Sequence, residues 1–250
     1  MLQFDLKAFE PRSFALTLAP APVCGQLKHS MPIELPYDTD LLSFNRNRAD
    51  CGTACPVALP AERFPSEIRC GGVRFVTGPK EDLAANAVIC RGQKLSIPEG
   101  AKYLSLMMAS LSGDRRTALT IGKTGFLFTV HDLLEAVGKW DLYGMQETGQ
   151  IKQTVLAWNA THLHRGDADS YGEQAYFFKY TFEIPAGAKS FTLPLDQNLL
   201  LLAASGTDLP ACRTAAPLYD TLKNGNLIFG SQKKTAGLHT LGCSPRRRVF

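Results

Sequence analysis

Two histidines stand two positions apart in the segment Thr161-His162-Leu163-His164, and Asp167 and Asp169 follow shortly after. In an extended chain alternate side chains point to the same face, so both imidazoles should lie side by side. Two imidazoles and a carboxylate suit a transition metal, and Asp167 with Asp169 and backbone carbonyl groups suits Ca²⁺ less well. The alternative is a strand-to-loop corner whose side chains hydrogen-bond to the turn. Because no further strong ligand is visible, we expect the corner and predict neither a metal nor another cofactor.

Four aromatic residues lie in or beside segments rich in Gly, Asp and Asn, where a ring is less often enclosed in a core. They are Trp140, Tyr143, Trp158 and Tyr171. An exposed ring can stack on the apolar face of a sugar while neighbouring polar side chains bind the hydroxyl groups. We therefore treat the four rings as candidate carbohydrate-binding residues. The alternative is that Trp140 and Trp158 cap the ends of a β-sandwich.

The segment from residue 43 to residue 50 is dense in guanidinium and carboxamide groups, with Asn45, Arg46 and Asn47 at its centre. Such planar donors bind hydroxyl groups or a carboxylate. They serve equally well to brace the rim of two sheets. Asn45, Arg46 and Asn47 are therefore candidate carbohydrate contacts whose role the sequence alone does not decide.

The sequence contains no recognisable hydrolase signature. It has no Gly-x-Ser-x-Gly elbow, no His-Glu-x-x-His pair and no Gly-rich phosphate loop. No two carboxylates stand out as a pair for glycosidic cleavage. We identify no catalytic residue, so whether the chain is an enzyme stays open, and a free-standing hydrolase is the least favoured hypothesis.

The composition is that of a folded, non-membrane chain. Of 250 residues, 45% are hydrophobic and 20% charged, and no apolar run approaches the roughly 20 residues of a membrane helix. The net charge of +4 is uneven, since the chain beyond Asp220 has six basic residues and no acidic one. The first 220 residues therefore carry a small negative charge, which argues against nucleic acid as a partner.

Seven cysteines cannot all pair within one chain, and they are too sparse for a disulfide scaffold. Cys51 and Cys55 form the only closely spaced pair. We expect reduced thiols, and a bridge or metal clip between Cys51 and Cys55 is the alternative.

Short apolar runs separated by Gly, Pro, Asn and Asp dominate the chain. In residues 176–184 every even position is apolar or aromatic, and the odd positions turn polar from Lys179 onward. This two-residue period predicts a strand with one buried and one solvent-facing side. Similar runs occupy residues 14–18, 73–76, 94–97, 103–108, 118–121, 126–130 and 199–204. Strands at this density predict an all-β fold, an antiparallel two-sheet sandwich of jelly-roll type.

Two further patterns refine this expectation. The sequence Ile97-Pro98-Glu99-Gly100-Ala101-Lys102 recurs as Ile184-Pro185-Ala186-Gly187-Ala188-Lys189, and Pro with Gly predicts equivalent turns at a sheet end. A minor helix of about two turns is expected over residues 131–138, ending at Gly138.

We divide the chain into a closing strand or hairpin of a preceding β domain (1–18), a proline-rich linker (19–36), the sandwich (37–220) and a basic, loosely structured tail (221–250).

Several segments occur in an order typical of one family. They are residues 6–14, 35–50, 72–75, 78–79, 86–93, 138–141, 157–164 and 176–180. Together they resemble the C-terminal β-rich region of bacterial α-mannosidases of glycoside hydrolase family 38. The resemblance extends from about residue 5 to residue 220 and implies that residues 5–18 close the enzyme's own β domain.

The resemblance also implies what the chain lacks. In that family the catalytic zinc, its ligands and the carboxylate nucleophile belong to an N-terminal catalytic domain, and no segment here matches it. The expected function is therefore a non-catalytic accessory β-sandwich module of an α-mannosidase-like enzyme, with carbohydrate as its ligand. The alternative is a purely structural domain whose partner is the glycosidase catalytic domain on which it packs.

Overall fold

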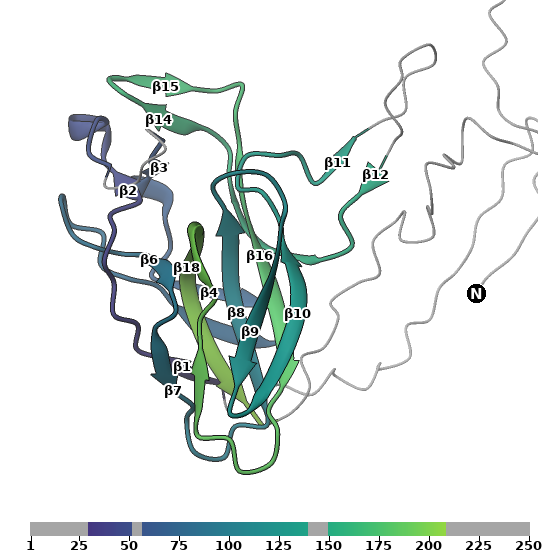
Figure 1. Ribbon diagram of the computed structural model, residues 1–250. Helices are drawn as coiled ribbons and strands as arrows, with labels where there is room; N and C mark the ends of the chain where they lie inside the picture. The colour runs from purple at the N-terminus through teal and green to yellow at the C-terminus, as the bar shows by residue number, and fades with distance from the viewer. Residues whose placement is uncertain (1–29, 52–56, 140–149, 209–250) are drawn as a thin grey trace, which may run out of the picture.

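The computed structural model describes residues 30–51, 57–139 and 150–208 (Figure 1). Its large sheet has the order β1 (Ser30–Ile33), β18 (Leu195–Thr207), β8 (Tyr103–Ser110), β16 (Ala175–Glu183) and β13 (Val155–Ala160), with β6 (Val88–Arg91) beside β18. A second sheet has the order β10 (Thr124–Val130), β9 (Arg115–Ile121), β17 (Ser190–Thr192) and β7 (Lys94–Ser96). Every pair in both sheets is antiparallel. The predicted all-β antiparallel sandwich is confirmed.

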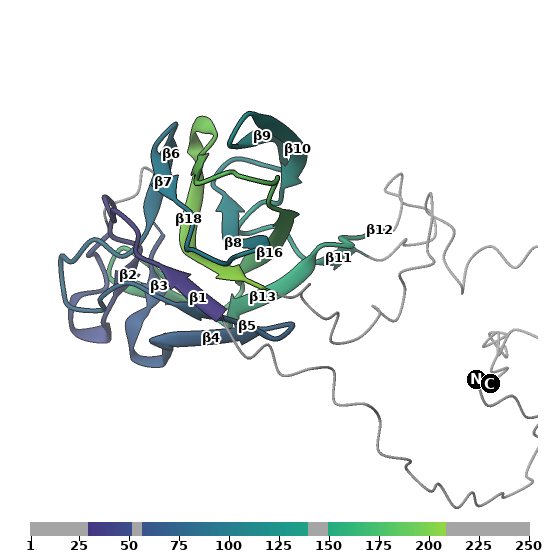
Figure 2. The ribbon, with the colours of Figure 1, turned by 90° about the horizontal axis from the view of Figure 1, so that it is seen from below.

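Four smaller strand pairs complete the described fold. They are β2 (Leu42–Ser43) with β3 (Leu59–Pro60), β4 (Glu67–Cys70) with β5 (Val73–Val76), β11 (Gly138–Lys139) with β12 (Gln150–Ile151), and β14 (Leu163–Arg165) with β15 (Ala168–Ser170). Only short 3-10 helices accompany them, η1 (Asn45–Asn47) and η2 (Ala61–Arg63), within the described residues. Figure 2 shows β9 and β10 on one side of the large sheet and β4 and β5 on the other. The large sheet is therefore covered on both faces.

Strand β16 shows the consequence of this double cover. Its even positions from Phe178 to Phe182 pack into the core between the two sheets, as the two-residue period predicts. The expectation of a wet opposite face is wrong for Phe177 and Lys179, which are also buried. Phe177 joins a second core under β4 and β5, and Lys179 Nζ donates a hydrogen bond to the carbonyl oxygen of Cys70 at 3.2 Å. A sheet covered on both faces buries both sets of side chains.

The helix predicted over residues 131–138 is wrong. The backbone N–H of Leu133 donates to Ser110 at 2.7 Å, and its carbonyl oxygen accepts from Tyr176 at 2.8 Å. Both backbone groups of Leu133 are therefore used by neighbouring strands and cannot form helical hydrogen bonds. The side chain of Asp132 instead accepts from the N–H groups of Leu134 and Glu135, which makes a local turn before β11.

Strand β1 lies inside the segment 19–36 that we expected to be a linker. It pairs with β18 from Ser30 opposite Thr207 to Ile33 opposite Ala204, so these four residues belong to the large sheet. The expected strand at 14–18 and the basic tail lie outside the described residues. Within the described ranges, no helix combines the length and apolar character that crossing a membrane requires. Cys70 and Cys90 are buried thiols.

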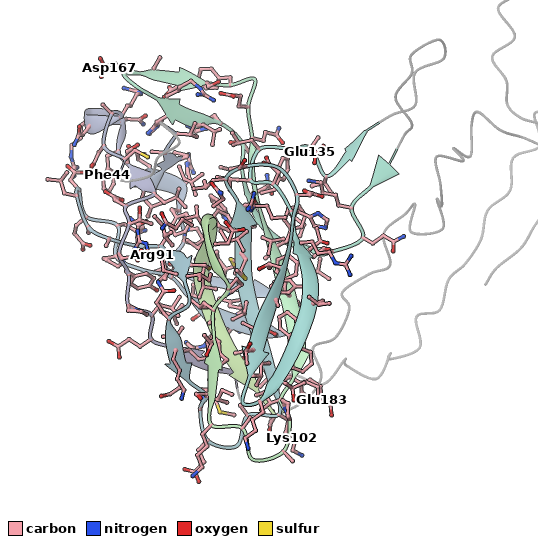
Figure 3. All side chains as sticks on the ribbon, viewed as in Figure 1. Phe44, Arg91, Lys102, Glu135, Asp167 and Glu183 are labelled. Atoms are coloured by element: carbon pink, nitrogen blue, oxygen red, sulfur yellow. The ribbon has the colours of Figure 1, made fainter. Side chains whose placement is uncertain are left out.

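The repeated Pro-x-Gly-Ala segments form two equivalent turns that connect the sheets. In each, the Ala N–H donates to the Pro carbonyl oxygen, from Ala101 to Pro98 at 3.2 Å and from Ala188 to Pro185 at 3.0 Å. The Gly at the third position has a positive φ in both turns, as a type II turn requires. The turns also bond reciprocally, because Ile97 donates to Lys189 and Ile184 to Lys102. This interlock closes the end of the sandwich where Lys102 and Glu183 lie (Figure 3).

We expect Gly187→Ala to lower the free energy of unfolding by about 1–2 kcal/mol, measured by urea denaturation. An added Cβ at Gly187 meets no atom within 4 Å, so the loss comes from its φ of +77° alone. Gly125→Ala is the matched control, because that site is equally open and its φ is not positive. Equal losses in the two variants would contradict the conformational argument.

Candidate functional site

The hairpin of β14 and β15 positions the histidine and aspartate side chains. Its loop has two residues, Gly166 and Asp167, and the φ of Gly166 is +59°, as the hairpin turn with Gly first requires. His164 and Asp169 are directly opposite each other in the register. Next to this pair, on the side away from the loop, the rings of His162 and Tyr171 lie 5.6 Å apart. The imidazole centroids of His162 and His164 are 5.8 Å apart.

His164 is fully buried and is fixed at both its backbone and its ring. Its backbone exchanges two hydrogen bonds with Ala58, at 2.9 and 3.0 Å. Its Nδ1 lies 2.8 Å from Ser43 Oγ, and that hydroxyl donates its single hydrogen to the carbonyl oxygen of Arg48 at 3.2 Å. When the hydroxyl hydrogen is used in this way, Ser43 Oγ accepts from Nδ1–H and a lone pair stays on Nε2. Burial lowers the pKa of His164, and the nearby charge of Asp169 opposes this only in part.

Asp169 is the charged centre of the hairpin face. Arg48 Nε donates to its Oδ1 at 2.8 Å, and the Tyr171 hydroxyl donates to its Oδ2 at 2.8 Å. These two hydrogen bonds, with Arg48 first, lower the pKa of Asp169 to about 2. The same carboxylate raises the pKa of Tyr171 through the hydroxyl bond. The side chains of Arg48, Asp169 and Tyr171 thus form one hydrogen-bonded chain, in which Arg48 and Asp169 are charged at neutral pH and the Tyr171 hydroxyl is neutral.

The helix η1 lies beside this chain. Arg48 Nη1 donates to the carbonyl oxygen of Asn45 at 2.6 Å, so Arg48 joins η1 to the hairpin. Asn45, Arg46 and Asn47 are all exposed. The Arg46 guanidinium lies over the Phe44 ring at 4.4 Å and pairs with Asp82 at 3.1 Å. In Figure 3 Phe44 and Asp167 mark this end of the molecule, opposite the interlocked turns.

The structure brings together only part of the predicted set. Asn45, Arg46, Asn47, His162, His164, Asp169 and Tyr171 lie at one end, whereas Asp167 is exposed in the hairpin loop and outside the cluster. Trp158 is half-buried and packs on Phe64 with ring centroids 5.0 Å apart, which agrees with the capping alternative. Trp140 and Tyr143 lie outside the described residues. Arg48 and Ser43 were not singled out from the sequence, although both belong to the polar segment at 43–50.

A second polar cluster lies near the base of β11 and β12. His131 Nδ1 lies 2.7 Å from Asp114 and its Nε2 lies 2.8 Å from the Thr154 hydroxyl. Lys152 Nζ pairs with Asp114 at 3.1 Å and with Glu135 at 2.8 Å, and its side chain is nearly fully buried. The order hydroxyl, imidazole, carboxylate is also found in hydrolases. Here the Asp114 carboxylate is shared with a buried ammonium group, so the cluster serves first to neutralise Lys152.

We expect Lys152→Met to lower the free energy of unfolding by about 1–2 kcal/mol at pH 7, because two charged hydrogen bonds are lost and both carboxylates can still be hydrated. Burial raises the pKa of Asp114, but hydrogen bonds from Asp132 N–H, His131 and Lys152 outweigh it and lower the pKa. The stabilisation that the ionised Asp114 carboxylate provides is therefore complete above its ordinary pKa of 3.8. It is lost as the pH falls through the lower pKa of Asp114 in the folded protein.

Urea denaturation at several pH values between 7 and 2 tests this prediction. Lys152→Met should lose less stability on acidification than the wild type, because part of the Asp114 stabilisation is already absent. Parallel pH profiles for the two proteins would contradict it.

An open groove of about 650 Å³ runs along residues 32–36 and 94–98. The apolar part of its lining includes Ile33, Leu35, Leu95 and Ile97. It follows the edge strands β1 and β7 of the two sheets. The groove therefore combines apolar side chains with the charged residues Glu34 and Lys94.

Comparison with known families gives one match. The sequence model described as the AziU2-like beta-sandwich domain matches residues 29–209, well over half of the chain. The match includes every described strand and supports the sandwich. It provides no link to the α-mannosidases of glycoside hydrolase family 38. A comparison with curated proteins finds no match.

Proposed function

We propose that this chain, which belongs to the family of AziU2-like β-sandwich domains, is a non-catalytic accessory module. We propose further that it binds a carbohydrate at the end where η1 meets the β14–β15 hairpin. The observation that carries the proposal is the ring of Tyr171, which is 75% exposed and is held in place by its own hydroxyl group.

The surroundings of Tyr171 support a sugar as the ligand. Its ring lies 5.6 Å from the His162 ring, with 31° between the two planes. Because the hydroxyl is bonded to Asp169, the ring loses little conformational freedom when a ligand stacks on it. Arg48 and the exposed amides of Asn45 and Asn47 lie on the same end and offer donors and acceptors for hydroxyl groups.

Isothermal titration calorimetry of the full chain against mannose, mannobiose and mannan tests the proposal. Mannose-type sugars are the first choice because the sequence resembles a region of α-mannosidases. We expect saturable heats with at least one of the three ligands. Flat heats at millimolar ligand, with the protein folded by circular dichroism, would remove carbohydrate binding and leave only the accessory role.

The groove along β1 and β7 favours a second candidate function, in which the domain packs on a glycosidase catalytic domain. An open groove lined by the partly buried side chains of Ile33, Leu95 and Ile97 along two sheet edges supports a role as an interaction surface. Sedimentation velocity with an α-mannosidase catalytic domain tests this candidate. A complex that is lost on Leu95→Glu would establish it, and unchanged sedimentation of both proteins would exclude it for that partner.

A further inference from the structure

The ring of His164 has one buried nitrogen, Nε2, without a partner. In the tautomer whose Nδ1–H donates to Ser43 Oγ, Nε2 presents a lone pair. This atom is buried and has no hydrogen-bond partner among the described residues. The nearest charged atom is Asp169 Oδ1 at 3.5 Å, which is also an acceptor. In that tautomer the Nε2 lone pair and the carboxylate oxygen repel each other, and a cation bound by both atoms relieves the repulsion.

A third donor completes the arrangement. His162, His164 and Asp169 each offer one ligand atom, and these atoms all lie within 4.8 Å of one another. Ligands of a tetrahedral Zn²⁺ are separated by about 3.3 Å at the usual bond lengths. His162 precedes β14 and is half-exposed, so its ring can move the short remaining distance. Nε2 of His164 and Oδ1 of Asp169 are already close to this separation.

We propose that His162, His164 and Asp169 form a binding site for a divalent transition metal of the Zn²⁺ type. Two imidazoles and one carboxylate leave at least one coordination position for water or an external ligand. The surrounding hydrogen bonds are those of an outer coordination sphere. Ser43 orients the His164 ring, and Arg48 and Tyr171 hold the carboxylate. Since a carboxylate oxygen has two lone pairs, Oδ1 can accept from Arg48 and still bind the metal.

This inference goes beyond the proposed function, because the three ligands need no carbohydrate. It also explains the residue between the two histidines, Leu163. The alternation of the strand turns the Leu163 side chain into the hydrophobic core while the two imidazoles face the carboxylate. In the pattern His-Leu-His the central side chain therefore packs in the core, and the two outer side chains face the carboxylate of Asp169.

Calorimetric titration of the full chain with Zn²⁺ alone, after treatment with a chelator and without sugar, tests the proposal. We expect the wild type to bind Zn²⁺ at this site. His162→Gln and Asp169→Asn should each weaken that binding by more than about 100-fold, the upper range for the loss of an outer-sphere contact. Both changes lie on the surface side of the cluster, and circular dichroism checks that each variant is folded.

The cysteines require a matched control. Cys51→Ser combined with Cys55→Ser should bind Zn²⁺ as the wild type does, because the three proposed ligands are two imidazoles and a carboxylate and include no thiol. In an NMR titration, the ring signals of His164 should shift with Zn²⁺ in the wild type and not in Asp169→Asn. Wild-type affinity in His162→Gln and Asp169→Asn, loss of binding in the cysteine variant, or no binding at millimolar Zn²⁺ would each overturn the proposal.

Discussion

Phe178→Ala should lower the free energy of unfolding by about 3–5 kcal/mol, the largest change that we expect from a single substitution. The Phe178 ring is fully buried in the core between the two sheets, in the middle of β16. It also lies 5.0 Å from the His131 ring and 5.8 Å from Lys152 Nζ, so its loss opens a cavity beside the second polar cluster. Urea denaturation followed by circular dichroism measures the change.

Leu127→Ala is the control for Phe178→Ala, because Leu127 lies on β10 of the same sandwich and is 70% exposed. Its loss of stability should stay within about 0.5 kcal/mol. If Phe178→Ala cost less than about 1 kcal/mol, the two sheets would not share the core that we describe.

Tyr171→Ala should weaken carbohydrate binding by about 30-fold, which corresponds to about 2 kcal/mol. The variant removes the exposed ring on which we expect the sugar to stack. Because the side chain is mostly in solvent, its removal should leave the melting temperature nearly unchanged. Calorimetry with the sugar that binds best to the wild type measures the effect.

Tyr171→Phe separates the ring from its hydroxyl group. It keeps the stacking surface and loses only the 2.8 Å hydrogen bond to Asp169. We expect a loss of affinity no greater than about fivefold, on the scale of one hydrogen bond. If Tyr171→Ala bound sugar as the wild type does, the ligand would not stack on this ring.

The strands were predictable from the sequence because their periodicity is local. Residues 73–76, 94–97, 103–108, 118–121, 126–130 and 199–204 all fall on or within one residue of observed strands. The burial of Phe177 and Lys179 was not predictable, because it depends on strands β4 and β5, about 100 positions earlier in the chain. The helix prediction was wrong for the same reason, because the backbone of Leu133 forms hydrogen bonds with Ser110 and Tyr176.

The sequence predicted the residue types of the site and the side of the hairpin on which its histidines lie. The spacing of His162 and His164, followed by Asp169, indicated that these side chains share a side, because the pattern is confined to one hairpin. The contact of Arg48 with Asp169 spans 121 positions and was not predictable from spacing. The pairing of Ser43 with His164 spans the same separation, so this contact of the His164 ring was not predictable from spacing either. Asp114, His131 and Thr154 also meet only after folding.

The most direct test of the account is an NMR titration of the ¹⁵N-labelled full chain with mannobiose. If the end formed by η1 and the β14–β15 hairpin binds the sugar, the amide signals of residues 45–48 and 162–171 should shift together and saturate. Signals at the interlocked turns, residues 97–102 and 184–189, should stay in place. Shifts confined to the turns or to the groove at residues 94–98, or no shifts at millimolar mannobiose, would contradict the account.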